Sequence, residues 1–134
     1  MALLVKNGEI VTSDSRYVAD IYVDDETIVR IGKNLEVPEG TEVVDATGKY
    51  VFPGFIDPHV HIYLPFMGTF AKDTHETASK AALVGGTTCY IEMCCPNRTE
   101  DALKDGYNLW KSKAEGNSAC DYAFHMGISK FDET

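Results

Sequence analysis

The chain has 134 residues, of which 44% are apolar and 25% charged, and a formal net charge of −9. This length accommodates one domain with a core or parts of two, and the negative charge disfavours a nucleic-acid partner, because phosphate binding needs clustered Lys and Arg. No apolar run approaches the roughly 20 residues that span a bilayer, and the first residues lack the basic leader of a secretory signal. We therefore expect a cytoplasmic protein with no membrane or nucleic-acid partner.

Residues 1–52 have the pattern of a small domain built from strands. Short apolar segments recur at residues 2–6, 9–12, 19–23, 27–31, 43–44 and 50–52. Asn7-Gly8 predicts a two-residue hairpin turn, because both central positions of a type I′ turn need positive φ. The acidic residues 24–26 and the pair Thr47-Gly48 mark further turns. Several short strands at this spacing indicate a small β-sandwich-like domain.

From residue 53 the pattern changes to alternating strands and helices. Strands are expected at residues 55–61, 87–93 and 122–128. Asp73 offers an N-cap, with Glu76 as its reciprocal acidic partner, for a helix that ends at Gly85-Gly86. Thr99 is expected to cap a second helix. One face of that helix carries, at helical spacing, Leu103, Tyr107, Trp110 and Ala114.

The alternation of strands and helices predicts an α/β fold with a parallel sheet, helices outside it and right-handed crossovers. A closed eight-stranded barrel needs about 250 residues, so only about three of its strands fit after residue 52. Residues 53–134 therefore predict the first βαβαβ portion of a TIM-type (β/α)8 barrel, which is incomplete in this chain.

The first strand of this second region carries the pair His59-x-His61. Residues i and i+2 of a strand share a face, so both imidazoles can point at one metal ion while Val60 packs the other way. Asp57 shares their parity and is placed to orient a ligand by a hydrogen bond, although Pro58 lies between them. Isolated histidine pairs also occur as ordinary core or surface residues, so the spacing alone leaves both interpretations open.

Several segments of the second region carry a resemblance to a known family. They are P-G-F-I-D-P-H-V-H at 53–61, L-P-F-M-G-T at 64–69, K-A-A-L-V-G-G-T-T at 80–88, Trp110, K-A-E-G at 113–116 and D-Y-A-F-H at 121–125. Together they resemble the dihydropyrimidinase and hydantoinase branch of the amidohydrolase superfamily. Residues 1–52 resemble the small N-terminal β-domain of the same family in layout.

The resemblance implies that His59 and His61 are the first two ligands of a binuclear zinc centre. Such a centre lowers the pKa of a bound water and polarises the substrate carbonyl, so that hydroxide opens a cyclic amide such as a 5,6-dihydropyrimidine or a hydantoin. The family's carbamylated lysine, two further histidines and catalytic aspartate come later than residue 134. Residues 1–134 alone are therefore expected to be inactive, and the intact enzyme to be a homotetramer.

The segment after the metal strand resembles the family's apolar gate beside the substrate's exocyclic substituent. Leu64, Phe66 and Met67 are its candidate substrate-loop residues, and an ordinary loop packed on the barrel rim is an equally open interpretation. Tyr63 stands where bacterial hydantoinases commonly carry aspartate and animal dihydropyrimidinases glutamine. This departure leaves the exact substrate open.

The remaining polar positions have no assigned role. Glu92 stands where the family tends to have aspartate, and a buried carboxylate needs a partner that the sequence does not identify. His75 is expected to be solvated and His125 to be a hydrogen-bonded core residue. The four cysteines are expected to be reduced, and Cys94 and Cys95 lack the basic neighbour that would activate a thiolate.

Two alternatives to a hydantoinase-type enzyme stay open. A non-catalytic, oligomerising relative would resemble the collapsin response mediator proteins, which typically lose the second histidine of the motif; here His61 is present. An allantoinase or dihydroorotase of the same superfamily fits less well, because the L-P-F-M-G-T and D-Y-A-F-H segments favour dihydropyrimidinases.

Overall fold

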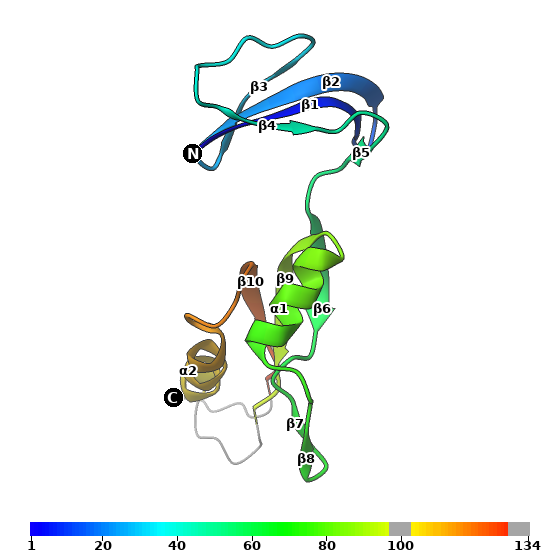
Figure 1. The fold of residues 1–134 in the computed structure, drawn as a ribbon. Helices are drawn as coiled ribbons and strands as arrows, with labels where there is room; N and C mark the ends of the chain where they lie inside the picture. The colour runs from blue at the N-terminus through cyan, green and yellow to red at the C-terminus, as the bar shows by residue number, and fades with distance from the viewer. Residues whose placement is uncertain (97–102, 129–134) are drawn as a thin grey trace. The chain divides into compact units, whose positions relative to one another are not determined.

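A computed structural model describes residues 1–96 and 103–128, as a mixed α/β protein. The chain divides into two compact units, Met1–Pro53 and Gly54–Thr134. The first contains only strands, and the second alternates strands with helices (Figure 1). No helix in the described ranges has the length and apolar character that crossing a bilayer requires.

The first unit is one five-stranded sheet. Its strands are β1 (Ala2–Val11), β2 (Arg16–Asp24), β3 (Thr27–Gly32), β4 (Glu42–Asp45) and β5 (Tyr50–Val51). The ten-residue β1 lies at the centre: it pairs antiparallel with β2 on one edge and parallel with β4 and β5 on the other. These residues form a single sheet, and the sandwich-like layout of the domain stays a prediction; the sequence pattern had split β1 into two short strands. The core beneath this sheet contains Ile10, Ala19 and Ile21.

Asn7-Gly8 forms a bulge inside β1 instead of the predicted hairpin turn. The pairing of β1 with β2 shifts register between Val5 and Gly8, and Asn7 has φ 61°. The positive φ that the sequence predicted is thus present, but a bulge uses it without reversing the chain. A Cβ on Gly8 would lie 2.5 Å from Val51 Cγ2, so the close approach of β5 also requires glycine. The hairpin predicted around residues 24–26 is confirmed by β2 and β3.

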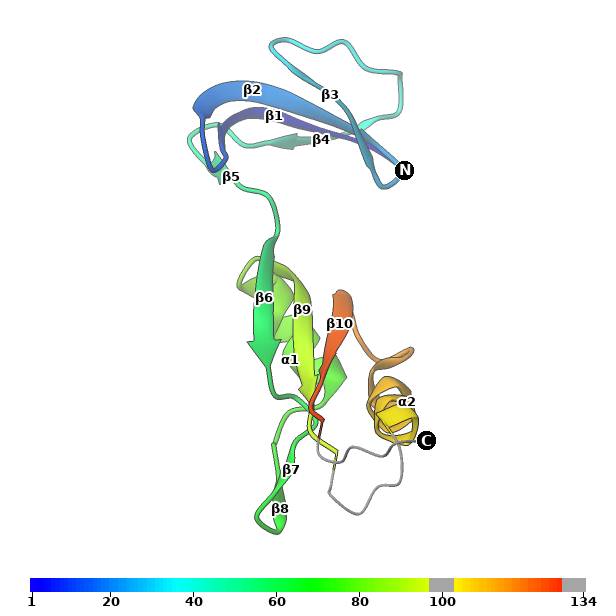
Figure 2. The same ribbon diagram turned by 180° about the vertical axis from the view of Figure 1, so that it is seen from behind.

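The second unit contains a three-stranded parallel sheet with helices between its strands. Its strands are β6 (Phe55–Val60), β9 (Thr87–Cys94) and β10 (Asp121–Met126), in the order β10-β9-β6. Helix α1 (His75–Val84) joins β6 to β9, and α2 (Leu103–Ala114) precedes β10. The views in Figures 1 and 2 agree that α1 lies against one face of this sheet. The order of strands and helices and the parallel pairing confirm the prediction, and no closed barrel is formed by the described residues.

Helix α1 begins one residue later than predicted. Thr74 is the N-cap: its hydroxyl accepts a hydrogen bond from the Thr77 N–H, and the Thr77 hydroxyl accepts one from the Thr74 N–H. The reciprocal pattern of a capping box is therefore made by two threonines, while Glu76 forms an ion pair with Lys80. Gly85 is the C-cap, as predicted. The expected cap Thr99 lies outside the described residues.

Candidate metal centre

A bulge in β6 sets the direction of the two histidines. Asp57 pairs with Tyr90 of β9, and Val60 pairs with Glu92. Between these two pairs β6 has two residues, Pro58 and His59, where β9 has one, so β6 contains a bulge. Proline is tolerated at such a bulge because it has no N–H to donate to the sheet. The Asp57 carboxylate accepts a hydrogen bond from the His59 backbone N–H at 3.1 Å. Asp57 therefore braces the backbone of His59, and its predicted role in orienting a metal ligand stays a prediction.

His59 and His61 direct the same ring nitrogen at one point. Their Nε2 atoms lie 3.2 Å apart, and the ring planes meet at 72° with centroids 5.0 Å apart. A zinc ion about 2.0–2.1 Å from both nitrogens would meet them at an angle of about 100°, near the tetrahedral value. The donor type and the spacing therefore fit two ligands of a zinc ion.

This pair supplies only part of a catalytic zinc site. Across residues 1–96 and 103–128, His, Cys, Asp and Glu side chains form no cluster of three or more that could hold a metal ion. Catalytic zinc normally keeps three protein ligands and one open position. The two histidines would therefore be an incomplete ligand set for a catalytic zinc.

The predicted substrate loop is a short hairpin that follows the two histidines. Strands β7 (Pro65–Phe66) and β8 (Thr69–Phe70) pair antiparallel. The two residues between them, Met67 and Gly68, have φ 50° and 79°, as a type I′ turn requires. Met67 is 89% exposed and Phe66 61% exposed. Two large apolar side chains held out on a tight hairpin are suited to contact another molecule or another part of the protein.

Comparisons with known proteins agree with this architecture. Residues 42–86 match the model of the "Amidohydrolase family". A solved D-hydantoinase (dihydropyrimidinase) from Thermus sp. is 80% identical and superposes with a TM-score of 0.93 over 98% of this chain. The chain matches the N-terminal portion of dihydropyrimidinases and hydantoinases. The resemblance inferred from the sequence motifs is thus confirmed.

The match covers the N-terminal portion of family members. The D-hydantoinase of Geobacillus stearothermophilus is 47% identical over 133 residues, which are 99% of this chain and 28% of that protein. The share of the Thermus sp. structure that is covered is also 28%. Human dihydropyrimidinase-related protein 5 is 40% identical over 127 residues, or 95% of this chain and 22% of that protein. The chain thus spans about a quarter of the length of the curated relatives it matches.

A buried polar pair close to the histidines was not predicted from the sequence. His75, expected to be solvated, is 2% exposed, and its Nε2 lies 2.8 Å from Oε2 of the fully buried Glu92. The solvation prediction was wrong because His75 lies on the face of α1 that packs on the sheet, together with the buried Ser79 four residues later. The four-residue spacing of His75 and Ser79, which places both on one face of a helix, was the signal in the sequence that could have predicted the burial of His75.

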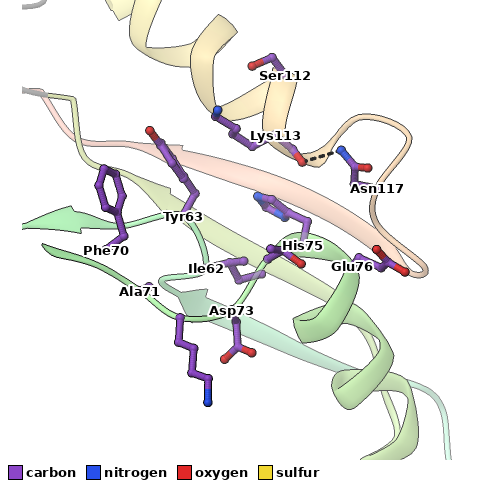
Figure 3. A pocket seen from close by; sticks show the side chains of 12 residues that line it. Ile62, Tyr63, Phe70, Ala71, Asp73, His75, Glu76, Ser112, Lys113 and Asn117 are labelled. Carbon is purple, nitrogen blue, oxygen red and sulfur yellow. Dashed lines mark hydrogen bonds between the residues drawn. The ribbon is translucent and has the colours of Figure 1, made fainter.

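Tyr63 also gains a structural assignment. Its ring packs edge-on against Trp110 at 5.2 Å between centroids, and the Lys113 ammonium lies 5.1 Å from the ring centre. Tyr63, His75 and Lys113 line a cavity of about 440 Å3 between the β6 exit and the two helices (Figure 3). Neither His59 nor His61 lines this cavity, so we place the candidate metal centre at the histidine pair and not in the cavity.

The cysteines and His125 do not add to the site. The four cysteines are free, and Cys94 is fully buried. Burial, reinforced by the nearby Glu92 carboxylate, raises the pKa of Cys94 to about 12, so its thiol stays protonated at neutral pH. His125 is exposed on β10, so the expectation of a core histidine was wrong.

Proposed function

We propose that this chain is the N-terminal part of a zinc-dependent hydrolase that opens cyclic amides, 5,6-dihydropyrimidines and hydantoins among them. The observation that carries the proposal is the 3.2 Å approach of the two Nε2 atoms in a chain 80% identical to a D-hydantoinase. The pair lies at the carboxyl end of β6. Active sites of (β/α)8 barrels gather at this end of the strands.

In this proposal each nearby residue has a separate task. His59 and His61 hold the metal through Nε2, and Asp57 keeps the His59 backbone in place. Zinc, when bound, makes a water acidic enough to attack at neutral pH and polarises the substrate carbonyl. Phe66 and Met67 present apolar surface to the substituent of the substrate ring.

The rest of the machinery is proposed to lie in the remaining part of an intact (β/α)8 barrel. From the resemblance we expect a carbamylated lysine, two histidines and an aspartate in that part, with the aspartate moving a proton from the nucleophile to the leaving nitrogen. Two imidazoles are fewer than the three protein ligands of a catalytic zinc, so residues 1–134 alone should not catalyse. We further propose a cytoplasmic homotetramer for the intact enzyme.

A second candidate is a non-catalytic, oligomerising relative. The 40% identity to human dihydropyrimidinase-related protein 5 favours it. Such relatives resemble the collapsin response mediator proteins, which typically lose the second histidine of the motif. His61 is retained here and lies within 3.2 Å of its partner nitrogen, which favours the enzyme.

Removal of metal separates the two candidates. The intact protein, treated with a chelator, is expected to lose ring opening of hydantoin and dihydrouracil and to regain it on addition of zinc, because the attacking water depends on the ion. The measurement is the loss of substrate absorbance alongside the zinc content. Undiminished hydrolysis by the metal-free protein contradicts the zinc-dependent mechanism. Absence of hydrolysis at full zinc content supports the non-catalytic relative.

A further inference from the structure

Glu92 is a fully buried carboxylate whose two oxygens serve different parts of the second unit. Its Oε1 accepts hydrogen bonds from the backbone N–H groups of Ile62 at 3.2 Å and of Tyr63 at 2.6 Å. Its Oε2 lies 2.8 Å from His75 Nε2, and Glu92 and His75 are 0% and 2% exposed. The hydrogen bonds to Oε1 are what compensates for the burial of this carboxyl group, because the contact between Oε2 and Nε2 is close but lacks hydrogen-bond geometry.

The hydrogen-bond partners assign the hydrogens along this network. Ser118 donates its one hydroxyl hydrogen to the Cys120 carbonyl at 2.7 Å, so its oxygen accepts from the Tyr90 hydroxyl at 2.9 Å. Burial raises the pKa of Tyr90 to about 12, so the phenol keeps its hydrogen. The Tyr90 oxygen must then accept from His75 Nδ1, 2.9 Å away. With Nδ1–H committed to Tyr90, His75 turns Nε2 toward Glu92.

The Glu92 carboxylate binds the backbone directly after His61. Ile62 and Tyr63 are the next two residues after His61. Two successive N–H groups on one oxygen fix both peptide planes, as in the backbone nests that hold anions. The Tyr63 ring is held separately by Trp110 and Lys113. The segment that leaves the histidine pair and enters the β7–β8 hairpin is therefore anchored at both its backbone and its side chain.

We propose that Glu92 is a positioning residue that holds the backbone at Ile62 and Tyr63, and so sets the direction of the His61 imidazole and the base of the substrate hairpin. The effect of Glu92 on metal binding rests on the proposed function. Its hold on the backbone of Ile62 and Tyr63 rests on the two hydrogen bonds alone. Glu92 touches neither metal nor substrate in this scheme and acts only through the backbone.

The test uses Glu92→Gln in the intact protein, with Ser79→Ala as the matched control. Ser79 is also fully buried and its hydroxyl accepts a backbone hydrogen bond, from Ala119 at 2.9 Å, a residue outside the histidine segment. Glu92→Gln is expected to weaken zinc binding roughly 10–100-fold, the effect typical of residues that orient metal ligands, and to speed amide hydrogen exchange at Ile62 and Tyr63. Ser79→Ala is expected to leave zinc affinity within about threefold, as a substitution whose lost hydrogen bond lies outside the histidine segment should. Glu92→Asp keeps the charge on a shorter side chain and should give an intermediate loss; it replaces Glu92→Gln if that variant does not fold.

Two measurements, zinc affinity by chelator competition and exchange by mass spectrometry, decide the outcome. If Glu92→Gln leaves amide exchange at Ile62 and Tyr63 unchanged, Glu92 does not hold this segment. If exchange becomes faster but zinc affinity is unchanged, Glu92 holds the segment without positioning His61. A loss of affinity that Ser79→Ala matches reports general destabilisation and also overturns the positioning role. If the wild-type protein binds no zinc, the proposed function fails, and exchange still decides whether Glu92 holds the segment.

Discussion

Replacement of His61 with alanine in the intact protein is expected to remove bound zinc and to reduce kcat/KM for hydantoin roughly 1000-fold or more. The physical reason is the loss of one of the two nitrogens that lie 3.2 Å apart. Charge stabilisation by a metal is worth several kcal/mol in the transition state, and about 4 kcal/mol corresponds to a factor of roughly 1000 in rate. Zinc content by atomic absorption and initial rates of ring opening measure both effects.

The controls for this prediction are His59→Ala and Lys80→Ala. His59→Ala should reproduce the loss, because the two imidazoles contribute equivalent ligands. Lys80 lies exposed on α1, where it pairs with the exposed Glu76, so Lys80→Ala should keep zinc content and rate within about twofold, since exposed ion pairs contribute little. A His61→Ala protein with wild-type zinc content and wild-type kcat/KM would contradict the assignment of the metal centre.

Replacement of Asp20 with alanine is expected to lower the free energy of unfolding by about 2–4 kcal/mol, because it removes the buried carboxylate that accepts two part-buried backbone hydrogen bonds. Asp20 is 3% exposed. Its carboxylate accepts hydrogen bonds from the Asn7 N–H at 2.9 Å and the Leu35 N–H at 3.1 Å. One side chain thus holds both the β1 bulge and the segment after β3. Chemical denaturation of the intact protein, with amide exchange at Asn7 and Leu35, measures the change.

Asp45→Ala is the matched control for Asp20→Ala. Asp45 belongs to the same sheet and accepts a backbone hydrogen bond from Thr47 at 3.0 Å, but it is exposed. Water replaces the lost acceptor there, so the cost should stay near 0.5–1 kcal/mol, at about the net value of an ordinary hydrogen bond. Equal losses for the two variants would show that burial of Asp20 does not set its contribution.

The same carboxylate gives the first unit a defined dependence on pH. The Asn7 N–H, helped by the Leu35 N–H, lowers the pKa of Asp20 against the opposing effect of burial. A lowered pKa in the folded state means that the stabilisation is complete above the unfolded value of about 3.9 and is lost as pH falls below it. Stability of the wild-type protein should therefore fall faster than that of Asp20→Ala below about pH 4.

The alternation of elements in the second unit could be predicted because it depends on local patterns. Strand β9 is a near-continuous run of β-prone residues, and glycines end α1 where a helix ends cheaply. Gly54 next to β6 shows what a pattern cannot reveal. A Cβ there would lie 2.0 Å from Thr88 Oγ1, a contact between segments that are distant in sequence.

The errors in the first unit and at α1 arose where one residue pattern serves two structures. Asn7-Gly8 supplies positive φ to either a turn or a bulge, and only the pairing partners of β1 decide between them. Asp73 and Thr74 are both good N-cap residues, and Thr77 made the reciprocal bond with the second. The choice at Asn7-Gly8 depends on tertiary contacts that a short window of sequence does not contain, whereas the two N-cap candidates compete within one window.

The candidate site was predicted in part. The prediction that His59 and His61 lie on the same side of a strand agrees with the approach of their rings. The same rule was used to include Asp57, but the bulge at Pro58 and His59 interrupts the alternation of side chains there. The partner of Glu92 was not found, because pairing a strand carboxylate with His75 requires knowing which face of α1 meets the sheet. Sequence gives the ligand type and its spacing, whereas the residues that hold the ligands come from packing.

The most direct test of the metal centre is anomalous diffraction at the zinc absorption edge from crystals of the intact protein. A zinc peak is expected about 2.0–2.1 Å from Nε2 of both His59 and His61. A peak bound elsewhere, with these two imidazoles turned to separate partners, would contradict this assignment.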